Sequence, residues 1–200
     1  MKEYKQTTLY TSGVACLLMV LNHFRPKEFE LTRENEFKLW QSTATLPTRG
    51  ACVFAMAVIA AEHNIPCYVI VGDPEYKFPF YRFYRLRKSE VEEANFTTQI
   101  YRKQAEKKGI SIDIRDFELE EIKKLLLKGK KIITRLNYGF LAGEKKPRIN
   151  YYLLDSYKEK RFLVYDPFKG KRLIEEKNIK QAFEGVVTKC KRDHRMIVFG

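Results

Sequence analysis

Residues 10–19 of this 200-residue chain read YTSGVACLLM, a short polar stretch followed by a glycine and apolar residues. The apolar run continues to Phe24, so the pattern predicts a buried helix over Ser12–Phe24. The amino end of a helix carries a partial positive charge that stabilises an anion or a thiolate. Gln6, just upstream, has an amide that can donate to an oxyanion. The start of this helix is therefore the first candidate site.

The remaining elements place helices before strands. Helices are predicted over 32–43, 51–64, 90–108 and 119–128, with a short one near 178–184. Strands are predicted over 67–71, 111–115, 131–136, 151–156, 161–165 and 194–199, and an extended segment over 4–10. The apolar strand 67–71 is expected to be central. This order indicates an α+β protein, a single domain over 1–200 with N-terminal helices packed on a mainly antiparallel C-terminal sheet.

The bulk composition is that of a globular chain, with 44% hydrophobic and 32% charged residues. No apolar run is long enough for a membrane span, and the first residues do not resemble a secretory signal. A cytoplasmic protein with reduced thiols is therefore expected. The cysteines form no Cys-x-x-Cys pair and the histidines are far apart, so neither a metal site nor a cofactor is predicted.

A second pair of motifs lies in the C-terminal third. Residues 147–157 read PRINYYLLDSY and residues 162–168 read FLVYDPF, and the turn 158–160 separates them. They are interpreted as two adjacent strands of a hairpin. Such a hairpin would bring Asn150 and Asp166 close together at one edge of the sheet.

Taken in order, these motifs resemble the bacteriocin-processing (double-glycine leader) peptidase-like family of the papain-like superfamily. The resemblance covers nearly the whole chain and implies a papain-like fold. It implies that Gln6 matches the oxyanion glutamine and Asp166 the orienting aspartate. Ser12 stands where the family has its catalytic cysteine, and Asn150 where it has its histidine.

These two departures change the expected chemistry. A serine hydroxyl is a weak nucleophile unless a base takes its proton, and an asparagine amide has no titratable nitrogen. Papain-like peptidase activity is therefore not expected. A serine introduced to trap a substrate would explain Ser12 but not Asn150. Ser12 is also a good N-cap residue, which we expect to be its present role.

Two cysteines are alternative nucleophiles. Cys16 lies one turn into the first helix and Cys52 near the start of another, but a role in the core is expected for both. Tyr10, Gly13 and Tyr151, beside the family positions, are candidate ligand contacts.

The segment 76–88, YKFPFYRFYRLRK, interleaves aromatic residues with cations. Its side chains, notably Phe78, Tyr81, Arg82 and Arg85, are candidates to rim the cleft and bind an anionic peptide or single-stranded nucleic acid. Phe83 and Tyr84 are further candidate stacking faces. The alternative is a loop that packs its aromatic rings on the core and exposes its cations.

Three interpretations of function remain open. The first is an inactive peptidase homologue that binds an extended peptide or another anionic ligand in the former active-site cleft, in keeping with the net charge of +13. The second is a cysteine peptidase or related acyl-transfer hydrolase whose nucleophile position is serine in this chain. The third is a basic nucleic-acid-binding protein, which is less favoured because no recognition motif accompanies the charge.

Overall fold

The computed structural model describes residues 1–200, apart from the side chains of Phe83 and Tyr84. The helices are α1 (Ser12–Phe24), α2 (Arg33–Thr43), α3 (Val53–Glu62), α4 (Lys88–Lys107), α5 (Leu119–Leu127), α6 (Tyr138–Ala142) and α7 (Glu176–Thr188), with a 3-10 turn η1 (Tyr81–Tyr84). The strands are β1 (Ala44–Thr45), β2 (Gly50–Ala51), β3 (Cys67–Val71), β4 (Ile112–Ile114), β5 (Lys131–Asn137), β6 (Ile149–Lys158), β7 (Arg161–Asp166), β8 (Gly170–Glu175) and β9 (Arg195–Phe199). The stretch Phe83–Tyr84 of the predicted aromatic surface thus lies outside the described side chains.

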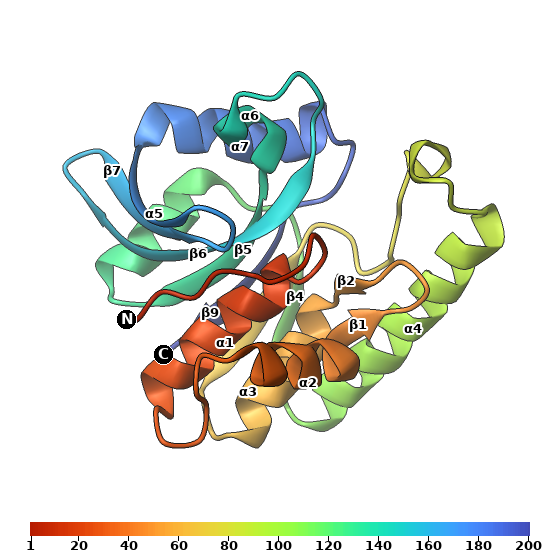
Figure 1. Ribbon diagram of the computed structural model, residues 1–200, viewed down its shortest axis with the longest axis horizontal. Coiled ribbons are helices and arrows are strands. Elements are labelled where there is room, and N and C mark those ends of the chain that lie inside the picture. Colours follow the sequence, from red (N-terminus) through yellow and green to blue (C-terminus); the bar gives the residue numbers. More distant parts are fainter.

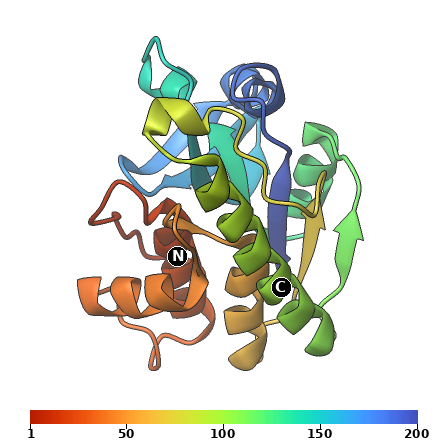
Figure 2. The same cartoon turned by 90° about the vertical axis from the view of Figure 1, so that its right-hand side faces the viewer.

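The main sheet has the strand order β4-β3-β9-β5-β6-β7-β8. All neighbouring strands in it run antiparallel except β3 and β4. The chain is therefore α+β, as predicted, and Figures 1 and 2 show the N-terminal helices on one side of the sheet. Strand β3 has neighbours on both sides but is second from the edge, so it is interior without being the middle strand.

Two apolar clusters cover the two faces of this sheet. Alternate residues of a strand point to opposite faces, and in β6 Tyr151 joins the cluster under α1 and α3 while Tyr152 joins the cluster under α5 and α7. Helix α1 lies deep in the first cluster, since every residue from Val14 to Leu21 is at most 1% exposed. Its apolar surface on all sides, read from the sequence, explains this position.

The C-terminal hairpin is confirmed. Lys158 pairs with Arg161, and the two residues between them, Glu159 and Lys160, have left-handed φ values of 52° and 56°. Such a two-residue turn suits the twist of antiparallel strands. A register shift between Leu154 and Ser156 then places Leu153 opposite Tyr165, and this pairing relates the end of β7 to the start of β6.

Other sequence predictions need correction. The segment 4–10 is not a strand, because its polar groups bond to Glu36 and to Pro167 O instead of to a ladder. Helix α7 is longer than the predicted 178–184, and strand β8 was not predicted. Strand β8 is an edge strand with a mostly exposed, polar sequence, which hides the usual strand pattern. None of the helices in the described residues combines the length and apolarity that a membrane span requires.

Candidate functional site

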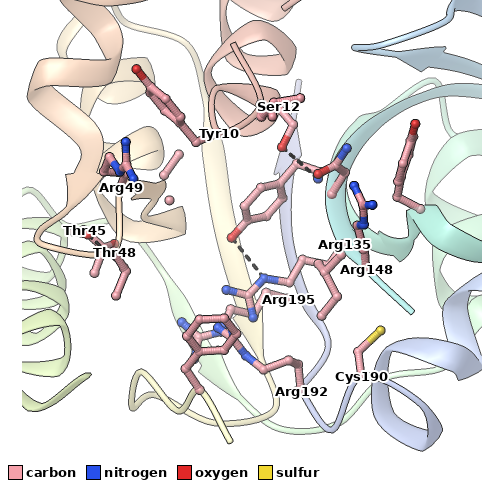
Figure 3. Close-up of a pocket in the computed structure, with 18 of the residues that line it drawn as sticks. Tyr10, Ser12, Thr45, Thr48, Arg49, Arg135, Arg148, Cys190, Arg192 and Arg195 are labelled. Atoms are coloured by element: carbon pink, nitrogen blue, oxygen red, sulfur yellow. Dashed lines mark hydrogen bonds between the residues drawn. The ribbon is translucent and has the colours of Figure 1, made fainter. Parts of the chain in front are cut away.

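A cavity of about 780 Å³ opens where the start of α1 meets the start of β6. Its size lies within the range of about 300–1,000 Å³ that is usual for ligand pockets. The lining comes from segments far apart in the chain, namely the residues before α1, the β1–β2 hairpin, the segment 76–86, the ends of β5 and β6, and residues 190–195. Figure 3 shows this pocket, with Ser12 and Tyr10 at one end and Arg192 and Arg195 at the other.

Ser12 lies at the pocket as the first residue of α1 and is 6% exposed. Its Oγ accepts a hydrogen bond from the backbone N–H of Tyr151 at 3.3 Å. The predicted N-cap role is wrong, because Thr11 occupies the cap position and Ser12 already has the helical backbone. The start of α1 and the start of β6 are thus joined at the position of the predicted nucleophile.

Gly13 permits this close contact between α1 and β6. A Cβ at this position would lie 2.9 Å from Cδ2 of Tyr151 and 3.0 Å from Cβ of Ala51. Separations below 3.0 Å are not tolerated without movement of the neighbours. Gly13 and Tyr151 are therefore packed against each other. Gly13 is absent from the pocket lining, whereas Tyr151 lines the pocket although it is only 6% exposed.

Asn150 lines the pocket, whereas Asp166 lies behind its wall. Leu153 pairs with Tyr165, so Asp166 continues the ladder opposite Tyr152, diagonally from Asn150. The Asp166 carboxylate accepts bonds from the backbone N–H groups of Phe168 and Lys169 and from the Arg172 guanidinium at 3.3 Å. Among the hydrogen bonds of the described residues, none joins Asn150 to Ser12 or to Asp166.

Gln6 lines the same pocket and lies beside the Asp-Pro turn. Its backbone N–H donates to Pro167 O at 2.7 Å, and its side-chain Nε2 donates to Thr8 O at 2.6 Å. The Oε1 atom is buried and has no hydrogen-bond partner among the described residues. The structure thus brings Gln6, Ser12 and Asn150 to one cavity, with the amide of Gln6 already bonded to the backbone.

Among the described side chains, no histidine lines the pocket. His63 pairs with Glu28 at 3.0 Å, and His194 stacks on Phe183 with ring centroids 3.7 Å apart. No group of histidines, cysteines and acids in the described part of the chain could hold a metal ion. The pocket therefore lacks an imidazole base within the region described.

The cysteines near the site are buried. Cys16 is fully buried in the core, as predicted, and burial raises the pKa of its thiol well above the ordinary value. Cys52 touches the pocket but is 4% exposed, and burial raises its pKa as well. Both thiols are thus held in the neutral form, which is a poor nucleophile.

The aromatic segment contributes only in part. Tyr76, Phe78 and Phe80 line the pocket, and so does Leu86 beyond η1. Tyr81, Arg82 and Arg85 are absent from the lining. The reason is the turn η1, which is followed by Arg85 in a left-handed conformation and carries these residues away from the cavity.

Tyr10 is another predicted contact that lines the pocket. Its ring packs against Trp40 at a centroid distance of 5.2 Å, and the Arg49 guanidinium lies 5.3 Å from the same ring. Tyr10 and Arg49 thus form one side wall, as Figure 3 shows.

The opposite end of the pocket is basic, and the sequence did not reveal it. Arg135, Arg192 and Arg195 all line the cavity there. Thr134 pairs with Met196 in the β5–β9 ladder, so Arg135 and Arg195 continue it directly opposite each other. The one available signal was an arginine at position 135 inside the apolar strand 131–136, where a buried cation is unusual.

Comparisons with known proteins give a family match and support the fold. The model of the Peptidase_C39 like family matches residues 1–199. A double glycine motif protease from an AMS/PCAT transporter, solved in complex with its leader peptide, has a TM-score of 0.55 at 14% identity, covering 99% of this chain and 89% of that one. A protein described as a C39-like peptidase from Bacillus anthracis has a TM-score of 0.48 at 12% identity, covering 100% of this chain and 94% of that one. No curated protein matched the chain.

Proposed function

Because the chain belongs to the Peptidase_C39 like family, we propose that it is a catalytically inactive papain-like peptidase homologue that binds an extended peptide in the pocket at Ser12. The observation that carries the proposal is the state of position 12, whose hydroxyl accepts a bond from the Tyr151 N–H in a pocket without a histidine among its described residues. Hydrolysis would need a group that takes the hydroxyl proton. Asn150 stands where the family has its histidine, and its side-chain amide cannot take that proton.

The retained shape supports a binding role. The first backbone N–H groups of a helix have no intrahelical acceptor, and α1 begins at the pocket. These groups and the helix dipole favour a carbonyl or carboxylate oxygen. The leader peptide bound to the structurally similar double glycine motif protease motivates a peptide as the ligand.

The enzyme interpretation has little support in the described residues. The thiols of Cys16 and Cys52 are buried and their pKa values are raised by burial. Asp166 is bonded to its own turn and to Arg172. A nucleophile elsewhere in the pocket would still require a base that the described lining does not provide.

The proposal can be tested with short fluorescein-labelled peptides that each contain two adjacent glycines. We expect fluorescence polarisation to detect binding and mass spectrometry to detect no cleavage by the unaltered chain. Leu9→Glu should weaken binding, because Leu9 is an exposed apolar residue of the pocket lining. Leu173→Glu is the matched control, since Leu173 is also an exposed leucine but lies outside that lining.

Three results would overturn the proposal. Cleavage by the unaltered chain, abolished by Ser12→Ala, would establish an enzyme. Equal binding by the Leu9 and Leu173 variants would place the peptide on another surface. Binding of single-stranded RNA in preference to every peptide, with a steep loss in salt, would favour the nucleic-acid interpretation.

A further inference from the structure

Three arginines from separate parts of the chain converge at the end of the pocket away from Tyr10 (Figure 3). Arg135 comes from β5, Arg195 from β9, and Arg192 from the segment between α7 and β9. The side chains of Arg135 and Arg195 are 7% and 2% exposed. Like charges opposite each other in a sheet destabilise it unless a counter-charge is present.

One carboxylate, that of Asp193, supplies the counter-charge to two of these arginines. It accepts from Arg195 Nε at 2.6 Å and lies 3.3 Å from Arg135 Nη1. Arg195 also donates to the carbonyl oxygens of Asp73 and Glu75, so it is a well-bonded structural residue. With Asp193 shared in this way, the arginine end retains a net positive charge.

Arg192 carries the remaining charge. Its Nε is buried and has no hydrogen-bond partner among the described residues, and its guanidinium carbon lies 5.0 Å from the Tyr76 ring centroid and 5.1 Å from that of Phe78. Burial, and then the nearby charge of Arg135, lowers the pKa of Arg192 to about 10. The side chain is therefore still protonated at neutral pH, and the aromatic rings fix its position.

Three further acids of this region already pair with other cations. Asp73 and Glu75 both pair with Lys77, and Glu144 of the pocket wall pairs with Arg148 at 3.2 Å. A partly buried cation without a counter-charge is costly, and an anionic ligand would relieve that cost. The Arg192 guanidinium at the cavity is therefore able to pair with an anion from outside the chain.

We infer that the arginine end, formed by Arg135, Arg192 and Arg195, is an anion subsite that binds a carboxylate of the peptide held in this pocket. This inference rests on the proposed function for the nature of the ligand. The arrangement of charges does not depend on that function. The planar fork of an arginine matches a carboxylate with two parallel hydrogen bonds. An acidic side chain or a free C-terminal carboxylate supplies the same chemistry.

The subsite is tested first with acetate as the probe, without any peptide. In acetate, compared with chloride at equal ionic strength, the melting temperature of the unaltered protein should rise by a few degrees. Arg192→Gln should abolish this rise, and Arg192→Lys should keep part of it. Arg82→Gln is the control for the loss of one positive charge, because Arg82 is exposed, lies in η1 and is absent from the pocket lining. An equal acetate effect in all four proteins would overturn the inference.

Peptides then identify the source of the carboxylate. Four versions of one peptide differ in having glutamate or glutamine and a free or amidated C-terminus. The version with the preferred carboxylate should bind about tenfold or more tightly than its neutral counterpart, and Arg192→Gln should remove that difference. If all four bind equally in the unaltered protein, the subsite inference fails while the proposed function stands. If none binds but acetate acts through Arg192, the proposed function fails and the anion subsite remains.

Discussion

The two ends of the pocket differ in what holds them together. At the Ser12 end, helix and strand meet through a bond between Ser12 Oγ and the Tyr151 N–H and through the close packing of Gly13. At the arginine end, three arginines line the cavity, and the carboxylate of Asp193 pairs with two of them, Arg135 and Arg195. Tyr151 connects the two ends, since its hydroxyl oxygen accepts from Arg135 Nε at 3.2 Å (Figure 3).

This difference shows that the two ends of the pocket depend on different kinds of interaction. The contacts at the Ser12 end use backbone groups and the absence of a side chain at Gly13, so they do not depend on a cysteine or a histidine. The arginine end depends on charge, and the described residues there carry more positive than negative charge. We therefore expect substitutions at the arginine end to change mainly the stability of the fold. Substitutions at the Ser12 end should change mainly the chemical reactivity of that position.

The largest expected effect is at the arginine end. Asp193→Asn removes the counter-charge between Arg135 and Arg195, which should cost about 3–5 kcal/mol of unfolding free energy. Urea denaturation measures this loss. Glu106→Gln is the control, because it removes the charge of a surface ion pair on α4 in which the Arg102 and Glu106 side chains are 28% and 48% exposed. The control should lose about 1 kcal/mol or less, and equal losses in the two variants would contradict a special role of the Asp193 charge in stability.

The next effect concerns reactivity at the Ser12 end. Combining Ser12→Cys with Asn150→His should lower the pKa of the introduced thiol, because an imidazole beside a thiol at a helix start favours the thiolate. Alkylation by iodoacetamide at pH 6, followed at that position by mass spectrometry, should be on the order of 10–100-fold faster than in Ser12→Cys alone. Equal rates would mean that positions 12 and 150 do not approach each other.

The smallest effect tests the packing at the same end. Gly13→Val forces its new side chain against Tyr151 and Ala51 and should cost about 1–3 kcal/mol. Gly50→Ala is the matched control in the same pocket, because a Cβ there meets no atom within 4 Å. Thermal unfolding compares the two, and an unchanged melting temperature in the Gly13 variant would show that α1 and β6 are not locked together.

Several features were accessible from the sequence because they depend on local patterns. The apolar run after Ser12 predicted α1 with its observed bounds, and the turn at 158–160 predicted the β6–β7 hairpin. The order of motifs indicated the family and the α+β fold. These signals are periodicity and turn chemistry, which act over a few residues.

The arginine end was not accessible in the same way. Arg135 and Arg195 are 60 residues apart and become neighbours only because β9 inserts between β3 and β5. Likewise, the sequence pattern predicted one basic aromatic surface over 76–88, whereas in the structure Tyr81, Arg82 and Arg85, in and just after η1, are absent from the pocket lining.

The sequence by itself therefore determined the helix that opens the site, the hairpin that closes it and the residue types at positions 12 and 150. Only the tertiary structure decided which charges share a cavity and which of them lack a counter-charge. The physical reason is that helix and turn propensities are local properties of the chain, whereas an electrostatic environment depends on strand order and burial.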